Sequence, residues 1–274
     1  MDIANRTIYI TGGTSGMGLM AAKMLAGLGA HIVVFNLNGD EAAMQSIADA
    51  RRAPSQRIGF FQVNIADRAA VLSTVGDAVI KCGAPDVMIN MAGIGGAAAF
   101  TEMKADLFDR IMQVNVQGTR NVVEAVLPHM LARKEGKIVL VGSMGGIIPV
   151  YGYTAYGASK FAVVGFAQCL RYELKPEWIS VACFCPGEVE TPGLAGERKS
   201  LPPASAALKK IGGTLPVEVA VRGLIEGIQK DQFMIIPGFK VKLTYWLYRI
   251  TPTMIWNAIT DAIVSKALRG PSKS

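Results

Sequence analysis

The sequence predicts an α/β fold with a parallel sheet that helices cover on both faces. Short runs rich in Val and Ile alternate with helical patterns along the chain, which is typical of a doubly wound sheet. The runs are apolar throughout, so both faces of these strands are expected to be buried, as in a parallel sheet. The 274 residues suit one large domain, and no linker or internal repeat divides them.

Six strands can be placed in chain order from these apolar runs. They are expected at residues 7–11, 31–35, 57–63, 86–90, 137–142 and 179–184. Helical patterns such as GLMAAKMLAGLG at residues 18–29 lie between them. The rhythm breaks at residues 188–215, a long connection containing Pro, Gly and Ser, before a further helix near Pro216. A long connection that follows a strand is usually functional.

Composition and charge argue against several classes of protein. Apolar residues make up 51% of the chain and charged residues 18%, which argues against disorder. The net charge of +7 suits an anionic cofactor, an acidic lipid surface or nucleic acid. Nucleic acid is not expected, because the basic residues are dispersed and the sequence has neither a recognition helix nor a zinc-finger spacing.

The four cysteines and two histidines do not have the spacing of a metal site, so no metal is expected. Cys183 and Cys185 fall on one face of a strand and are expected to be core thiols. The N-terminus lacks the pattern of a secretory signal. No apolar run approaches the roughly 18 residues of a spanning helix. These features indicate a cytoplasmic protein.

The first predicted strand leads into a glycine-rich turn, TGGTSGMG, at residues 11–18. Gly12, Gly16 and Gly18 would let the backbone turn sharply and approach a pyrophosphate, whose charge the N-terminus of the next helix favours. The spacing differs from the common GxGxxG. Its place at the first strand–helix junction of an alternating chain nevertheless predicts a dinucleotide cofactor.

The end of the second strand bears on which dinucleotide is bound. Asn36 stands where an acidic residue would hold the adenosine ribose of NAD. Asn36 can still hydrogen-bond a hydroxyl and does not repel a 2′-phosphate, although Leu37 supplies no cation for one. Asp40, the nearest carboxylate, is expected to cap the next helix. Hydroxyls at Thr14 and Ser15 could bind the phosphate, so the sequence favours NADP(H) over NAD(H).

Three tyrosines occur in YGYTAYGASK, residues 151–160. Only Tyr156 has a lysine four residues later, Lys160, on the same helix face. An ammonium beside a phenol lowers the pKa of the phenol. The pair therefore predicts that Tyr156 donates a proton to a ketone or accepts one from an alcohol. Tyr151 and Tyr153 precede this helix and are expected to line the pocket.

Two further polar residues belong to this pattern. Ser143 follows the strand in KIVLVGSMGG, thirteen residues before Tyr156. Asn115 lies inside a helical pattern, DRIMQVNVQG, where a polar residue that weakens the helix requires a reason. A solvent-facing Asn115, or one bonded back to its own helix, is the alternative to a functional one.

The chain resembles the classical short-chain dehydrogenase/reductase family over roughly residues 5–236. The resemblance rests on motifs in the family's order and spacing: TGGTSGMG (11–18), NMAG (90–93), VNVQG with Asn115, VGS with Ser143, YGASK (156–160) and PGEVET (186–191). It implies a seven-stranded Rossmann-type sheet. It also implies that Tyr156 exchanges the proton, while Lys160 lowers its pKa and holds the nicotinamide ribose. Ser143 would hydrogen-bond the carbonyl oxygen, and Asn115 would anchor a water of the proton relay.

The resemblance further implies the residues of the cofactor site. These are Gly12, Thr14, Ser15, Gly16, Met17, Gly18, Asn36, Asn64, Ile65, Asn90, Ala92, Gly93, Tyr156, Lys160, Pro186, Gly187, Val189 and Thr191. Three positions depart from the family pattern: NMAG replaces NNAG, and Asn36 and Asn64 replace acidic residues. All three concern the adenosine half of the cofactor, so they bear on the preference between NAD and NADP rather than on the chemistry.

Residues 188–215 would cover the substrate, as the resemblance implies. Their cations, Arg198, Lys199, Lys209 and Lys210, are expected to be solvated. The stretch TPGLAGERKSLPP and the apolar tail are similar to 3-ketodihydrosphingosine reductases and to other lipid- and steroid-acting members of the family. Those reductases use NADPH and usually carry an arginine where Leu37 stands.

The tail, residues 238–274, contains two amphipathic segments broken at Pro252. Leu243, Trp246, Leu247 and Ile250 share one helix face, Ile255, Ile259 and Ile263 share another, and the first is flanked by Lys240, Lys242 and Arg249. Two interpretations remain open: packing against the pocket or another subunit, or an interfacial anchor on acidic lipid. Residues 1–237 are expected to form the catalytic domain, which the tail extends.

The sequence therefore predicts an NAD(P)-dependent oxidoreductase acting on the carbonyl or secondary alcohol of a bulky hydrophobic substrate, such as a keto-lipid, a steroid or an aryl ketone. A homodimer or homotetramer is expected, as is common in the family. One alternative is a non-catalytic NAD(P)-sensing protein on the same fold, against which the intact set of Asn115, Ser143, Tyr156 and Lys160 argues. Another is a membrane-associated interaction protein that works through its tail.

Overall fold

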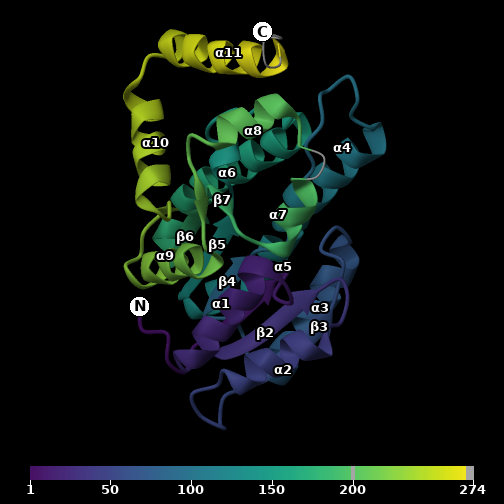
Figure 1. The fold of residues 1–274 in the computed structure, drawn as a ribbon. Helices are drawn as coiled ribbons and strands as arrows, with labels where there is room; N and C mark the ends of the chain where they lie inside the picture. The colour runs from purple at the N-terminus through teal and green to yellow at the C-terminus, as the bar shows by residue number, and fades with distance from the viewer. Residues whose placement is uncertain (199–200, 270–274) are drawn as a thin grey trace.

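A seven-stranded parallel sheet forms the centre of the computed structural model, which describes residues 1–198 and 201–269 (Figure 1). The strands are arranged in the order β3-β2-β1-β4-β5-β6-β9, and each neighbouring pair is parallel. Their bounds are β1 Thr7–Thr11, β2 His31–Asn36, β3 Ile58–Gln62, β4 Val87–Asn90, β5 Gly136–Val141, β6 Ile179–Phe184 and β9 Met234–Ile235. The predicted α/β fold and doubly wound sheet are confirmed.

Helices cover both faces of the sheet and close two apolar cores. Ile8 and Ile10 of β1 point into one core and Tyr9 into the other, which explains why this strand is apolar at successive positions. Cys183 and Cys185 are buried free thiols in the core that contains Tyr9, as expected. The helices over the first core are α1 (Gly16–Gly27), α2 (Glu41–Asp49) and α9 (Val217–Gln229), and those over the second are α3 (Arg68–Cys82), α5 (Gly118–Arg133) and α6 (Thr154–Leu174).

The strand order reverses between β1 and β4. The chain first builds β1, β2 and β3 outward and then places β4 on the other side of β1. Thr11 and Asn90, the last residues of these two strands, are partners in the sheet. A crevice opens beyond the carboxyl ends of the strands at such a reversal, and it is where α/β proteins bind ligands. After β4 the chain continues through α4 (Ala105–Met112) and a π-helical turn, Gln113–Gln117, into α5.

In residues 188–198 and 201–215, the long connection forms regular elements rather than an irregular loop. Two short strands, β7 (Glu188–Val189) and β8 (Thr214–Leu215), pair in parallel and bring its two ends together. Between them lie α7 (Pro192–Glu197) and α8 (Pro203–Lys209). Lys199, one of the cations expected to be solvated, lies outside the described residues.

The tail forms two helices, α10 (Phe239–Ile250) and α11 (Thr253–Arg269), which are separated at Pro252 as expected. Figure 1 shows them in yellow, with α10 rising from the region of α9 and α11 crossing above α8. Val241 of α10 is buried over Gly187, where an added Cβ would lie 2.9 Å from the Val241 Cγ2. None of the described helices is both long enough and apolar enough to cross a membrane.

Candidate active site

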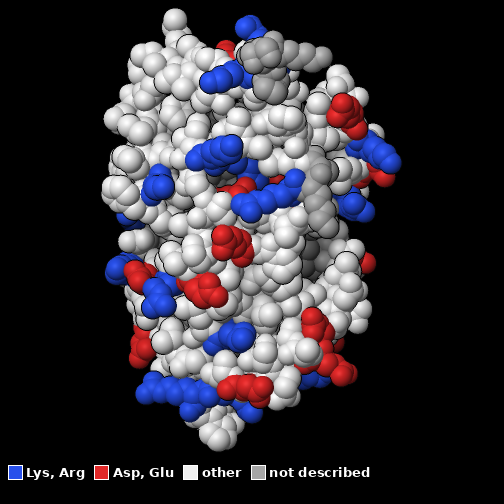
Figure 2. Space-filling model, in the orientation of Figure 1, with Lys and Arg blue, Asp and Glu red and all other residues white. Residues whose placement is uncertain are grey.

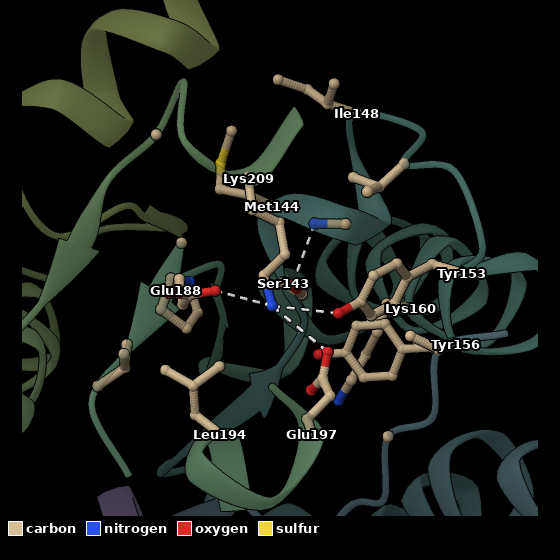
Figure 3. A pocket seen from close by; sticks show the side chains of 18 of the residues that line it. Ser143, Met144, Ile148, Tyr153, Tyr156, Lys160, Glu188, Leu194, Glu197 and Lys209 are labelled. Carbon is tan, nitrogen blue, oxygen red and sulfur yellow. Dashed lines mark hydrogen bonds and ion pairs between the residues drawn. The ribbon is translucent and has the colours of Figure 1, made fainter. Parts of the chain in front are cut away.

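A cavity of about 590 Å³ opens beyond the carboxyl ends of β4, β5 and β6 (Figure 3). Its inner side, here called the cavity floor, is formed by Gly93, Ser143, Tyr156, Lys160 and Pro186. Its outer side, the cavity roof, is formed by α7, α8, α10 and α11. The roof residues are Leu194, Glu197, Leu208, Lys209, Val241, Thr244, Trp256 and Thr260. Most of the remaining lining is apolar or glycine, which suits an apolar ligand.

The structure brings Ser143, Tyr156 and Lys160 together on the cavity floor. Ser143 lies two residues after the end of β5. Its Oγ accepts a hydrogen bond from the Gly145 N–H at 3.0 Å, and its side chain hydrogen-bonds the Tyr156 phenol. Lys160 is one helical turn beyond Tyr156 on α6, and its Nζ lies 5.8 Å from the centre of the Tyr156 ring. The same Nζ donates a hydrogen bond of 2.7 Å to the Val141 carbonyl. The chain at the end of β5 therefore holds both catalytic candidates of α6: the Val141 carbonyl binds Lys160, and the Ser143 side chain binds Tyr156.

The pKa of Tyr156 differs from the sequence expectation. Burial raises it above its ordinary value and outweighs two effects that lower it, the hydrogen bond with Ser143 and the positive charge of Lys209. The expected lowering by Lys160 is therefore wrong. Burial also lowers the pKa of Lys160 to about 8, which weakens its ammonium as a partner for a phenolate. The spacing of Tyr156 and Lys160 predicted their proximity but not the burial of both groups.

The other two tyrosines of this segment have separate places. Tyr153 lines the cavity, and its ring meets that of Tyr156 edge-on at 5.7 Å between centroids. Tyr151 is not among the lining residues, contrary to expectation. Its carbonyl instead accepts a hydrogen bond of 2.6 Å from the Ser205 hydroxyl at the start of α8. Tyr151 therefore holds the roof in place, whereas Tyr153 contacts the space where a ligand would lie.

Asn115 sits in the π-helical turn before α5 and is 1% exposed. Its Oδ1 accepts a 2.9 Å hydrogen bond from the Ile94 N–H, and its Nδ2 donates to the Ile94 carbonyl and the Ser159 hydroxyl, both at 2.9 Å. It is neither solvent-facing nor bonded back to its own helix. Asn115 thus ties the backbone after β4 to α6, beside the floor residue Gly93, where an added Cβ would lie 3.1 Å from its Oδ1.

The glycine-rich turn has the geometry of a cradle for an anionic group. Gly12 and Gly16 have positive φ, at 68° and 50°, a region that side chains with a Cβ rarely adopt. A Cβ on Gly18 would lie 2.0 Å from the Gly12 carbonyl oxygen. The turn opens α1, whose N-terminus favours a phosphate. A Cβ on Gly16 would lie 3.4 Å from the Thr191 methyl, so the turn adjoins the cavity. These residues fit a dinucleotide cofactor.

The remaining cofactor candidates divide into two groups. Met17, Gly93, Pro186, Gly187, Val189 and Thr191 line the cavity together with Tyr156 and Lys160. The others lie outside its lining: Gly12, Thr14, Ser15, Gly16, Gly18, Asn36, Asn64, Ile65, Asn90 and Ala92. The first group is thus placed for the reacting end of a cofactor. The second follows the edge of the sheet from the glycine-rich turn towards the end of β3.

Several side chains of that second group serve the fold. Asn90 is 2% exposed, accepts a hydrogen bond of 2.7 Å from the Thr11 hydroxyl and donates one of 2.8 Å to the Thr119 hydroxyl. The side chain of Ile65 is buried in a core. Asn36 donates to the Asn38 carbonyl at 2.9 Å. The side chains of Asn90 and Ile65 therefore join the strand ends and the core to their neighbours.

Asp40, the carboxylate nearest to Asn36, caps the next helix, α2, as expected. Its Oδ1 accepts a hydrogen bond from the Ala43 N–H at 2.9 Å. Asn64, in contrast, is exposed and accepts the Ala66 N–H at 3.0 Å. No carboxylate takes the place of Asn36 at the end of β2 among the residues that the structure describes.

A charged cluster in the roof was missed from the sequence. The Nζ of Lys209 lies 2.8 Å from a Glu188 oxygen and 3.3 Å from a Glu197 oxygen, and it donates a 3.1 Å hydrogen bond to the Tyr153 hydroxyl (Figure 3). Arg198 also pairs with Glu188. The expectation that Lys209 is solvated is therefore wrong, whereas Arg198 and Lys210 are exposed, as expected.

Electrostatics hold this cluster in its charged form. Burial acts to raise the pKa of Glu188, but hydrogen bonds from Lys209, Thr214 and Arg198 outweigh it and hold that pKa at about 2. Glu188 is therefore a carboxylate at neutral pH, and Lys209 has a charged partner there. No local spacing could have found this pair, because its members belong to two short elements that meet only in the folded chain.

Trp256 of α11 covers the cavity from the tail. Its ring meets Tyr248 of α10 edge-on at 5.2 Å between centroids. Its indole Nε1 is buried and has no hydrogen-bond partner within residues 1–198 and 201–269. A buried donor without a partner is costly, so a ligand acceptor at this position would be favoured.

Comparisons with known proteins agree with this geometry. The family model described as "short chain dehydrogenase" matches residues 6–201. The 3-dehydrosphinganine reductase of Danio rerio is 32% identical over 229 residues, which is 82% of this chain and 69% of that protein. The oxidoreductase UcpA of Escherichia coli K12 is 32% identical over 191 residues, 69% of this chain and 72% of that protein.

A solved short-chain dehydrogenase/reductase from Burkholderia phymatum, in complex with NAD, superposes with a TM-score of 0.77 at 25% identity, over 90% of this chain and 94% of that one. The fold, the cavity at the carboxyl ends of the strands and the family match lead to one conclusion. The chain belongs to the short-chain dehydrogenase family and is an NAD(P)-dependent oxidoreductase that acts on CH–OH groups.

Proposed function

We propose that the protein reduces the carbonyl of a bulky apolar ketone, or oxidises the matching secondary alcohol, with NADP(H) as the favoured cofactor. The observation that carries this proposal is the cavity of about 590 Å³, which joins a polar floor to largely apolar walls. Part of this volume would hold the nicotinamide end of the cofactor, and the largely apolar walls around the rest favour an apolar ligand. The relatives named as sphinganine reductases act, by that name, on a long-chain keto compound.

The floor residues divide the chemistry between them. A bound nicotinamide would supply or accept the hydride. Tyr156 exchanges the proton with the substrate oxygen, which Ser143 also hydrogen-bonds, so that charge developing on this oxygen is stabilised. Lys160 holds the nicotinamide ribose and orients Tyr156. Because burial raises the pKa of Tyr156, its phenol holds the proton that carbonyl reduction consumes.

Asn115 completes this arrangement as a positioning residue. Its side chain hydrogen-bonds both the N–H and the carbonyl of Ile94 and donates to the hydroxyl of Ser159, which lies three residues after Tyr156. A water bound near this junction would reconnect Lys160 to solvent after each proton transfer. The proposed relay thus runs from Tyr156 through Lys160 towards Asn115.

Asn36 supports the preference for NADP(H). It leaves the end of β2 without a negative charge, so a 2′-phosphate is not repelled there. Thr14 and Ser15 in the adjoining turn supply hydroxyls. We expect Asn36→Asp to raise the KM for NADPH by roughly tenfold and to change the KM for NADH much less. Steady-state kinetics with both cofactors measure this, and an unchanged NADPH/NADH ratio would contradict the assignment.

The proposal also covers the domain organisation, the compartment and the oligomeric state of the protein. Residues 1–237 act as the catalytic domain, and residues 238–274 extend it by covering the substrate; support comes from the roof residues of α10 and α11. Four free cysteines support a reducing compartment such as the cytoplasm. A homodimer or homotetramer is the oligomeric state that we propose.

The test is nicotinamide absorbance against time with NADPH and NADH in parallel. The ketones are a long-chain 3-keto amino alcohol, a ketosteroid and a small aryl ketone. We expect turnover of at least one bulky ketone and preference for NADPH. Cofactor binding without turnover of any bulky ketone, but with turnover of small polar ones, would overturn the proposed substrate class.

A further inference from the structure

The outward side of the tail helices carries large apolar side chains that the rest of the chain does not cover. We call this surface the tail face; its residues are Phe239, Leu243, Trp246, Leu247, Ile250, Met254, Ile255 and Ile259. Each of them is at least 46% exposed, and Phe239 and Met254 exceed 80%. Single exposed apolar residues are ordinary on protein surfaces, but a contiguous row on two consecutive helices indicates an interaction surface.

The tail face is not simply the unpacked side of loosely attached helices. The opposite side of the same helices already packs inward, because Val241 is 1% exposed and Trp256 packs on Tyr248 and lines the cavity. Leu243, Trp246, Leu247 and Ile250 repeat with helical spacing on the outer side. α10 therefore has one apolar side turned to the protein and another turned to solvent, and α11 adds Met254, Ile255 and Ile259 to the exposed apolar residues.

The charges around the tail face indicate which partner suits it. Residues 239–269 contain five basic side chains, Lys240, Lys242, Arg249, Lys266 and Arg269, and one acidic side chain, Asp261. Figure 2 shows this region, at its upper left, as white and blue surface with very little red, whereas red and blue alternate lower down. An apolar row bordered by cations is complementary to an anionic lipid surface.

We propose that the tail face binds the surface of an anionic lipid bilayer, with α10 and α11 lying in the plane of the interface. The apolar side chains would enter the boundary between headgroups and acyl chains, and Lys240, Lys242 and Arg249 would contact lipid phosphates. A second copy of the chain fits this face less well. A symmetric contact would place ten cations beside two anions, because each tail contributes five and one.

The helices that carry the tail face also form part of the cavity roof. Val241, Thr244, Trp256 and Thr260, which line the cavity roof, belong to the same two helices. Bilayer binding would therefore hold the cavity roof at the lipid boundary, where an apolar substrate is concentrated. This consequence rests on the proposed function, whereas the docking itself does not.

Flotation with lipid vesicles tests the docking without any enzymatic readout. The full chain is mixed with vesicles of phosphatidylcholine alone or of phosphatidylcholine with phosphatidylserine. The test variant is Trp246→Glu with Ile250→Glu, two side chains that are 56% and 73% exposed. The matched control is Trp178→Glu with Ile80→Glu, which are 78% and 85% exposed, lie outside the tail and introduce the same charge.

We expect the unmodified chain and the control to float with the anionic vesicles, and the test variant to bind at least about tenfold less. Binding should weaken with added salt and on phosphatidylcholine alone. An unmodified chain that fails to float, or a control that loses as much binding as the test variant, would overturn the proposal. Light scattering without lipid supplies a further check. A dimer that only the test variant dissociates would assign the tail face to a contact between copies and overturn the lipid assignment.

Discussion

The cavity floor and the cavity roof are built by different means. On the floor, Lys160 is 6% exposed and bonded to a strand carbonyl, and Asn115 is 1% exposed and bonded to the Ile94 backbone on both sides. On the roof, Lys209 is held by side-chain ion pairs and Trp256 by an edge-on ring contact. Lys160 and Asn115 of the floor are therefore fixed by backbone groups at the end of β5 and after β4, whereas Lys209 and Trp256 of the roof are held by side chains.

This difference separates the chemistry from the choice of substrate. The floor residues are bonded to the end of β5 and lie on α6, so we expect their placement to survive changes in the roof. The two tail helices of the roof pack on the protein through few buried side chains: Val241 is the fully buried residue of α10, and α11, described in full from Thr253 to Arg269, has none. Elements with few buried contacts open at low free-energy cost. We therefore expect this part of the roof to open more readily than the floor.

The largest effect is expected from the floor. Tyr156→Phe removes the hydroxyl that exchanges the proton, and turnover should fall by about a thousandfold or more. Cofactor affinity should change by less than about twofold, because the ring and its packing remain. Steady-state kinetics and cofactor titration measure the two quantities. Tyr153→Phe is the control, since Tyr153 lines the same cavity, and it should keep turnover within about tenfold. Equal losses in the two variants would contradict the assignment of Tyr156.

The next largest effect concerns the glycine-rich turn. Gly18→Ala places a Cβ 2.0 Å from the Gly12 carbonyl oxygen, so the backbone of the turn must move. A displacement of this kind should weaken cofactor affinity by roughly 10- to 100-fold and destabilise the fold by about 1–3 kcal/mol. Gly76→Ala is the control, because no described atom lies within 4 Å of a Cβ there. In the middle of α3 it should stabilise the protein by about 0.5–1 kcal/mol. Isothermal titration with the cofactor and thermal unfolding distinguish the Gly18→Ala variant from the Gly76→Ala control.

The same contrast explains what the sequence could predict. Backbone requirements leave local signatures: Gly12 and Gly16 adopt positive φ, and Tyr156 and Lys160 share a helix face, so short motifs located most of the floor. The parallel sheet followed from its apolar strands. Strand β9 was not predicted from the hydrophobic pattern, because a strand of two residues is too short to show a periodicity. The seventh strand was expected only from the family resemblance.

The roof left no such signatures. Glu188 and Lys209 lie in separate short elements, and only the pairing of β7 with β8 and the packing of α8 bring them together. The Pro252 break predicted two tail helices, but amphipathic spacing alone does not say which side turns to solvent. Burial likewise cannot be read from an i, i+4 spacing, which is why the direction of the Tyr156 pKa shift was wrong.

A smaller effect is expected from the roof cation. Lys209 lowers the pKa of Tyr156, so Lys209→Met should raise that pKa further. Reduction needs the protonated phenol and falls as pH rises through this pKa, whereas alcohol oxidation needs the phenolate and increases there. Both limbs of the pH profile should therefore move to higher pH. Lys210→Met, one residue away on the exposed side, should leave the pH profile in place.

The stability of the Lys209→Met variant at low pH is an independent test of the ion pair. The pKa of Glu188 is held near 2, below its ordinary 4.5, so this group stabilises the fold above about pH 4.5 and loses that contribution as pH falls towards 2. Without Lys209 the depression is smaller, and the loss of stability over this pH range should be smaller as well. A pH profile and an acid transition both unchanged in Lys209→Met would show that the ion pair has no influence on the floor.

The smallest effect is expected at Trp256, where stability and binding should change in opposite directions. Trp256→Phe removes a buried N–H that has no partner in the described part of the chain and keeps a ring against Tyr248. Removing an unsatisfied donor should stabilise the free protein by about 1 kcal/mol, or roughly 2–4 °C in Tm. If the N–H donates to a polar group of the bound substrate, KM should increase by about three- to tenfold while kcat changes little. A raised Tm with an unchanged KM would mean that the indole only fills space in the roof. A lowered Tm would mean that its bulk, not its N–H, holds α11 over the cavity.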